Sequence, residues 1–110
     1  MPRLVCSHLN SRKIMPMPKC FSVYGYVVFF WSNEGYPIES VHVHIAQRMG
    51  PDTTKVWILS DGSVELANNN SHIPHNELRK IMKVIEVYSD DIVNQWMSYF
   101  NAPLTYHDLT

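Results

Sequence analysis

The run from Phe21 to Trp31 constrains the fold more than any other stretch, because nearly every residue in it is aromatic or β-branched. Residues of these types favour β-strands, and Gly25, the one weak point of the run, is interpreted as a bulge. The run is apolar on both faces, which is typical of a strand that is covered on both sides or placed at an interface. The chain is therefore expected to build its layers on a sheet that contains this strand.

Three shorter strands are predicted downstream, separated by turn clusters of Gly, Asn, Asp, Ser and Pro: residues 41–47, 54–59 and 63–67. A register that keeps their Val and Ile side chains on one face sets His44 opposite Trp57. For the last pair, a three-residue loop that ends in a left-handed Gly62 sets Ile58 opposite Val64. The four strands then form an antiparallel meander.

Apolar residues recur at spacings of three and four from Leu78 to Phe100, which is the pattern of amphipathic helices. Pro74 suits the first turn of a helix, and a bend or short break is predicted near Ser89. The predicted fold class is α+β: a four-stranded antiparallel β-meander packed against a C-terminal helix or helix pair.

The 110 residues suit a single α+β domain, expected at residues 21–101, with a poorly ordered extension at 1–20 and a short tail at 102–110. The net charge is −1, so there is no global basic field to attract nucleic acid. No signal peptide is visible, and two widely spaced cysteines, Cys6 and Cys20, form neither a disulfide framework nor a metal-finger pattern. We expect a reduced, cytoplasmic protein and predict no cofactor.

The most suggestive chemistry lies at His42 and His44, which share one face of a predicted strand. Two imidazoles side by side can act as general acid and base in phosphodiester cleavage. They can instead be two ligands of a metal, although no recognisable set of four ligands surrounds them, and no metal is predicted. The bland alternative is ordinary alternation on a half-exposed sheet face.

The predicted register gathers further side chains on the face that carries the two histidines, which we call the His face: Lys55, Trp57 and Glu65. Lys55 can stabilise a developing phosphorane charge, or simply form a cross-strand ion pair with Glu65. Trp57 can stack an exposed base, or be buried beneath a neighbour. The predicted ligand-binding residues are Arg48, Trp57, Glu65 and Asn69.

An ordered series of motifs resembles a family of small bacterial proteins, the domain of unknown function 4160: Tyr24-Gly25-Tyr26, Ser32-Asn33-Glu34, His42-Val43-His44, Thr54-Lys55-Val56-Trp57 and a late Trp96. The resemblance covers about residues 21–101. The chain departs from the family before His42, where Glu39-Ser40-Val41 follows Pro37-Ile38 as a three-residue insertion. Members of the family are suspected to belong to toxin–antitoxin gene pairs.

Two classes of function stay open. The first, which the resemblance brings in, is a toxin–antitoxin component that acts on RNA through His42 and His44, as a metal-independent, nuclease-like hydrolase. The second is a non-catalytic interaction module, partner-binding or antitoxin-like, that uses the His/Trp face of the sheet. The expected partners are a small cognate protein, RNA or, because the run at 21–31 is apolar on both faces, a second copy of the chain.

Overall fold

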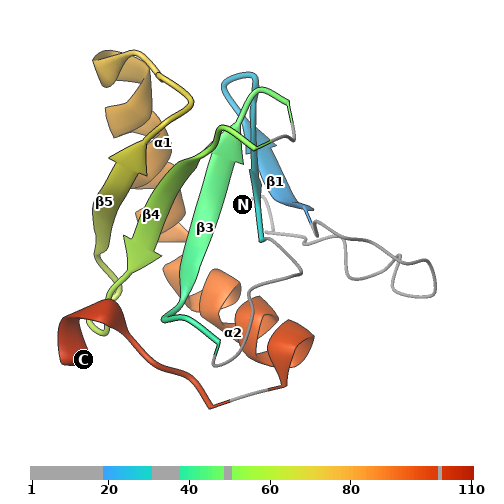
Figure 1. Cartoon of the computed structure of the whole chain (residues 1–110), viewed down its shortest axis with the longest axis vertical. Coiled ribbons are helices and arrows are strands. Elements are labelled where there is room, and N and C mark those ends of the chain that lie inside the picture. The colour runs from blue at the N-terminus through green and yellow to red at the C-terminus, as the bar shows by residue number, and fades with distance from the viewer. Residues whose placement is uncertain (1–18, 31–37, 49–50, 102) are drawn as a thin grey trace.

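The computed structural model describes residues 19–30, 38–48, 51–101 and 103–110. Its elements, in chain order, are β1 (Lys19–Val23), β2 (Tyr26–Phe29), β3 (His42–Ala46), β4 (Thr54–Ile58), β5 (Val64–Asn69), α1 (His75–Val87), α2 (Ser89–Phe100) and a 3-10 turn at His107–Leu109. The strands form one antiparallel sheet in the order β1-β2-β3-β4-β5 (Figure 1). The α+β class is confirmed, with five strands where four were predicted.

The additional strand arises because the run that begins at Phe21 folds back on itself. Tyr24 and Gly25 both have positive φ, 52° and 82°, and Val23 pairs with Tyr26 across them. Positive φ at both central residues defines the two-residue hairpin turn whose twist matches that of the flanking strands. Gly25 therefore marks a hairpin rather than the predicted bulge, and β1 begins at Lys19. Residues 1–18 of the predicted extension lie outside the described part of the chain.

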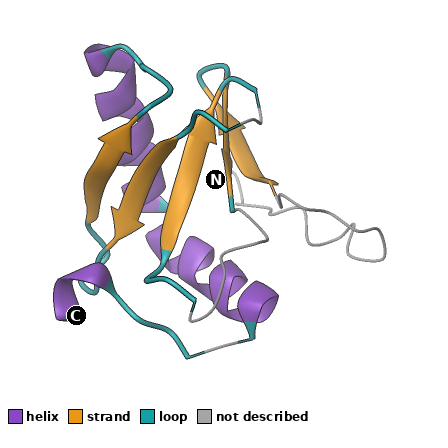
Figure 2. Cartoon of the chain, viewed as in Figure 1, coloured by secondary structure: helices purple, strands orange, loops and turns teal. Residues whose placement is uncertain are grey.

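The apolar core joins one face of the sheet to the two helices, and Trp96 of α2 also reaches His42 on the other face. In Figure 2, α1 runs behind the strands and α2 lies near their lower end. The sheet contributes Val28, Val43, Ile45, Val56 and Ile58, and the helices contribute Leu78, Ile81, Ile85, Ile92 and Trp96. The predicted break near Ser89 is confirmed, with Tyr88 between the two helices. Among the described residues, neither helix is long and apolar enough to cross a membrane.

Tyr26 ties the sheet to the start of α1. Its hydroxyl donates a hydrogen bond to Glu77 Oε1 at 2.8 Å. Burial raises the pKa of the Tyr26 hydroxyl, and the bond to Glu77 raises it further. Tyr26 therefore remains the neutral donor that this contact requires.

The register of β4 and β5 matches the prediction, whereas that of β3 and β4 differs from it by two residues. Ile58 pairs with Val64, and Gly62 has φ of 89° in the loop between them, as expected. His42, not His44, lies opposite Trp57. A shift of two residues leaves every side chain on its predicted face, so the apolar pattern alone cannot distinguish the two registers.

Residues 103–110, which we call the strap, return from the end of α2 to the sheet (Figure 1). The Val41 backbone N–H donates to the Thr105 carbonyl oxygen at 3.0 Å. The Thr105 hydroxyl donates to Ser40 Oγ at 3.3 Å. The sequence predicted only a short tail here, so the docking of the strap on the sheet was missed.

Candidate functional site

β3 places its two histidines on the face opposite to Val43 and Ile45, because successive side chains of a strand alternate between faces. The centroids of the His42 and His44 rings lie 4.9 Å apart. Both side chains are buried, with His42 only 1% exposed and His44 only 9% exposed. The prediction that the histidines lie together is confirmed, whereas the half-exposed face that the non-functional alternative assumed is not observed.

The Nδ1 atom of each imidazole lies within hydrogen-bond distance of a neighbouring polar group. His42 Nδ1 donates to the Ser40 carbonyl oxygen at 2.8 Å. His44 Nδ1 lies 2.9 Å from the hydroxyl oxygen of Thr53, which is itself buried. These contacts fix the orientation of both rings, because a buried polar group is costly unless it is hydrogen-bonded.

Aromatic rings surround the histidines on several sides. Phe29 of β2 stacks on His44 at a centroid distance of 5.8 Å. Trp96 of α2 and Trp57 of β4 both contact the His42 ring edge to face, at 5.1 Å and 5.5 Å. The His pair is thus packed among rings from three other elements, as a core cluster is.

Lys55 lies at the margin of the His face and is paired with Glu39 rather than with Glu65. Lys55 Nζ donates to Glu39 Oε1 at 2.6 Å, and it also lies 4.3 Å from the ring centroid of Trp57. The same Glu39 oxygen is 3.9 Å from His42 Nδ1. Glu65 is exposed opposite Trp57, so the predicted Lys55–Glu65 ion pair gives way to a Lys55–Glu39 pair.

The strap adds an aromatic and an acidic contact at the end of β4. The His107 ring stacks on Trp57 with centroids 4.3 Å apart and planes within 3° of parallel. Asp108 accepts hydrogen bonds from the Ser60 backbone N–H at 3.0 Å and from the Ser60 hydroxyl at 2.6 Å. The hydroxyl bond is the main reason that the pKa of Asp108 lies below its ordinary value. His107 therefore occupies one face of Trp57, the side chain that was expected to stack an exposed base.

Arg48 lies away from the His pair. It is exposed after β3 and lines a hollow of about 710 Å³ together with Asp52 and Glu77. Ala46, which shares the strand face of the histidines, lines this hollow, but His42, His44, Lys55, Trp57 and Glu65 do not. The structure therefore does not bring Arg48 to the predicted site.

Asn69 is the last residue of β5, and its side chain holds the connection from β5 to α1. Its Oδ1 accepts hydrogen bonds from the Thr54 hydroxyl at 2.6 Å and from the Ile73 backbone N–H at 3.0 Å. Its Nδ2 donates to the Ile73 carbonyl oxygen at 3.0 Å. Asn69 is thus engaged by internal partners and pairs with Thr54 inside β5, where a loop was predicted.

A metal centre finds little support in this arrangement. In the described ranges, no group of three His, Cys, Asp or Glu side chains is placed to hold a metal ion. His72 and His75, the two histidines that precede or open α1, are both exposed. Two imidazoles alone fall short of the three or four protein ligands typical of zinc sites.

Several residues that complete the site were not predicted from the sequence: Glu39, Ser40, Thr53, His107 and Asp108. A signal did exist for the first two, because Glu39-Ser40-Val41 is the segment where the chain departs from the expected motif. In the structure this segment approaches the histidines directly, through Glu39 and the Ser40 carbonyl. Nothing in the local sequence indicated that His107 would return to Trp57.

The family model described as Domain of unknown function (DUF4160) matches residues 25–97. The chain belongs to the DUF4160 family. No curated protein and no solved structure matches it. The DUF4160 region includes β2 to β5 and α1, whereas the strap lies beyond the matched residues.

Proposed function

We propose that this member of the DUF4160 family is a non-catalytic binding module rather than an RNA hydrolase. The observation that carries the proposal is the burial of the His pair, since His42 is 1% exposed and His44 is 9% exposed. A general acid or base must come within hydrogen-bond reach of the proton that it transfers, directly or through one water. The aromatic packing around the His pair supports a structural role over direct contact with a phosphodiester.

The charges near the His face also favour this interpretation. Among the described side chains on and beside that face, the carboxylates Glu39, Glu65 and Asp108 outnumber the single cation Lys55. An RNA backbone is polyanionic, and proteins that bind it neutralise phosphates with Lys and Arg. Lys55 is already paired with Glu39, so little positive potential is left to attract a phosphate.

The toxin–antitoxin association expected of the family fits this proposal in one of its two roles. A small partner-binding protein suits the neutralising member of such a pair, whereas an RNA hydrolase suits the toxic member. The proposal assigns the chain to the first role and expects its contacts to be with protein.

The test combines expression with an assay of RNA cleavage. We expect the purified protein to leave single-stranded RNA intact, and its expression to cause no growth arrest. His44→Gln serves as the test variant, and Glu65→Gln as a control on the same face that leaves both histidines in place. Loss of a general acid or base typically reduces a rate by about 10²- to 10⁴-fold. RNA cleavage by the wild type that falls by this factor in folded His44→Gln, and not in Glu65→Gln, would overturn the proposal.

A further inference from the structure

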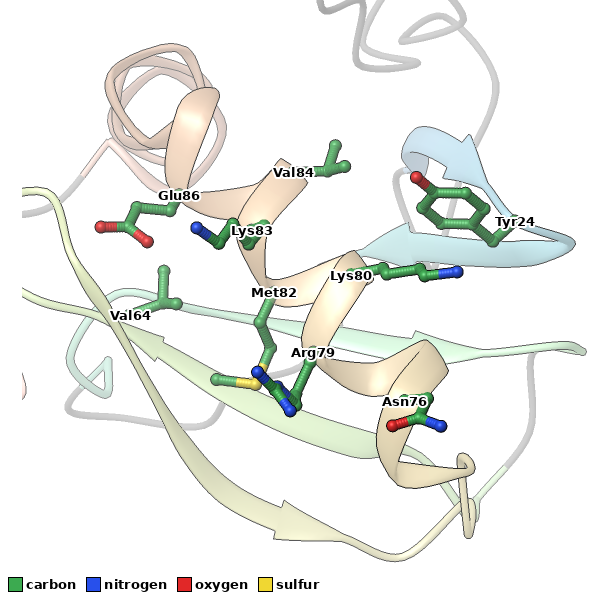
Figure 3. Close-up of a pocket in the computed structure, with 9 residues that line it drawn as sticks. All are labelled: Tyr24, Val64, Asn76, Arg79, Lys80, Met82, Lys83, Val84 and Glu86. Carbon is green, nitrogen blue, oxygen red and sulfur yellow. The ribbon is translucent and has the colours of Figure 1, made fainter.

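The helix α1 borders a hollow on the side of the sheet away from the His face. The hollow has a volume of about 800 Å³ and extends along α1 between β5 and the β1–β2 turn (Figure 3). On the β5 side its lining residues are Val64, Arg79, Met82, Lys83 and Glu86, and we call this part the α1–β5 groove. In Figure 3 the Met82 side chain points from α1 towards the sheet, and Val64 points from β5 towards α1. The floor of the groove is therefore apolar.

One wall of the groove is an open sheet edge. β5 is the last strand in the order of the sheet, and no strand among the described residues pairs with its outer side. The Ser63 carbonyl oxygen accepts from the Leu59 N–H, so the backbone groups of Ser63 point towards β4. Backbone groups alternate in direction along an antiparallel strand, so those of Val64 and Leu66 point outwards. These groups can form a ladder with an added strand.

The side chains of β5 suit an added strand as well. Val64 and Leu66 share the strand face that is directed towards the helices, and Leu66 is nevertheless 39% exposed. Exposed apolar side chains next to unpaired backbone groups are the features that peptide-binding sheet edges use. Alternate apolar side chains of a bound strand would pack beside Val64 and Leu66.

The rim of the groove is mainly cationic. Exposed Arg79 and Lys83 belong to the groove, Lys80 adds a third cation on the Tyr24 side of the hollow, and Glu86 is the one carboxylate among the described lining residues. The other carboxylate in α1, Glu77, is engaged by the Tyr26 hydroxyl. A partner complementary to this rim carries negative charge, since complementary potentials favour and steer association.

We propose that the α1–β5 groove binds an extended acidic segment of a partner protein, which pairs with β5 as an additional strand and places alternate apolar side chains against Val64, Leu66 and Met82. This inference rests on the proposed function as a binding module and names its partner class. Single-stranded nucleic acid would also meet the cations Arg79 and Lys83, but it uses neither an open strand edge nor an aliphatic floor. Protein is therefore the occupant that the groove favours.

The probe is a fluorescein-labelled octapeptide that alternates valine with glutamate, and its counterpart alternates valine with lysine. We expect the acidic peptide to bind the full chain, to bind more weakly as salt is raised, and to shift the amide NMR signals of β5. The double variant Arg79→Glu/Lys83→Glu should weaken binding at least tenfold. Arg48→Glu, a charge reversal at an exposed residue outside the groove, should leave binding unchanged.

A second variant tests the strand pairing itself. Leu66→Pro removes an outward-pointing N–H, a change that edge strands tolerate, and it should abolish binding while the thermal unfolding transition remains cooperative. The double variant Arg79→Glu/Lys83→Glu tests the groove independently, whether or not Leu66→Pro folds. Absence of binding, equal binding of the lysine peptide, or no loss in Arg79→Glu/Lys83→Glu would each overturn the inference. Binding of a single-stranded RNA oligonucleotide that this variant loses, in place of peptide binding, would also overturn it.

The cleavage assay on the same samples separates the two proposals. If RNA stays intact and the acidic peptide fails to bind, the proposal that the α1–β5 groove binds a peptide is rejected. The proposal of a non-catalytic binding module is then retained. If RNA is cleaved in a His44-dependent manner, the proposal of a non-catalytic binding module is rejected. The peptide result then tests only whether the α1–β5 groove binds a peptide.

Discussion

A single residue, His44, shows how the buried site is maintained. Its ring lies between Phe29 and the Thr53 hydroxyl, and both neighbours are buried. Imidazole suits this position because its flat ring stacks on Phe29 while its Nδ1 atom forms the hydrogen bond with Thr53. The sequence could identify the pair His42 and His44, because a spacing of two residues on a strand fixes a common face. It could not identify Thr53, since the hydrogen bond depends on the register between strands.

At this scale we expect His44→Ala to destabilise the fold. The substitution removes a buried ring and leaves the Thr53 hydroxyl without this partner, which costs about 1–3 kcal/mol. Glu65→Ala on the same face should change the free energy of unfolding by less than about 0.5 kcal/mol, because Glu65 is exposed. Urea unfolding followed by circular dichroism measures both values. Equal effects of the two substitutions would contradict a structural role for His44.

Among the elements, the β1–β2 hairpin and the strap escaped prediction for different physical reasons. Both arms of the hairpin are apolar and its turn has only Gly25 as a signal, so the run reads as one strand. Only two apolar side chains of the strap, Leu104 and Tyr106, pack against the core, and its hydrogen bonds to the rest of the protein join residues 48 to 65 positions apart in the chain. Hydrophobic periodicity carries no information about such contacts. Helices α1 and α2 were predicted because their stripes span several turns.

The strap should be released by acid. The pKa of Asp108 is lowered in the folded chain, so its contribution to docking is complete above the ordinary value of 3.8 and is lost as the pH falls through the lower folded value. Ser60→Ala removes the hydroxyl donor that is the main cause of this shift, so release should occur at a higher pH. The indole N–H signal of Trp57, whose ring contacts His107, reports the change by NMR. A Trp57 signal with the same pH dependence in Ser60→Ala and wild type would contradict this account.

For the molecule as a whole, the reason to predict a homodimer has become weaker. The run from Phe21 to Trp31 is apolar on both faces. Within β2, however, Val28 and Phe29 lie on opposite faces of the sheet, and both side chains are buried by other residues of the same chain. The fold itself therefore accounts for this part of the apolar surface. The β5 edge, not β1 and β2, is where we place association with a partner.

We accordingly expect a monomer in the absence of a partner. Size-exclusion chromatography with light scattering at micromolar concentration should give a mass near 12.8 kDa. A mass near twice this value would support the dimer that the sequence suggested. The peptide probe would then have to compete with the second subunit for β5 if both used the same edge.

Val41 joins the strap to the sheet through its two backbone groups. Its N–H donates to Thr105 of the strap, while its carbonyl oxygen accepts from the Ile58 N–H at 3.1 Å. The strap can detach while the sheet persists, because local opening needs less free energy than global unfolding. Deuterium from the solvent would then replace the Val41 amide proton during openings of the strap, whereas the Ile58 amide exchanges only when β3 separates from β4. Exchange at a single amide thus reports how often the strap leaves the sheet, although His42 and His44 remain in place.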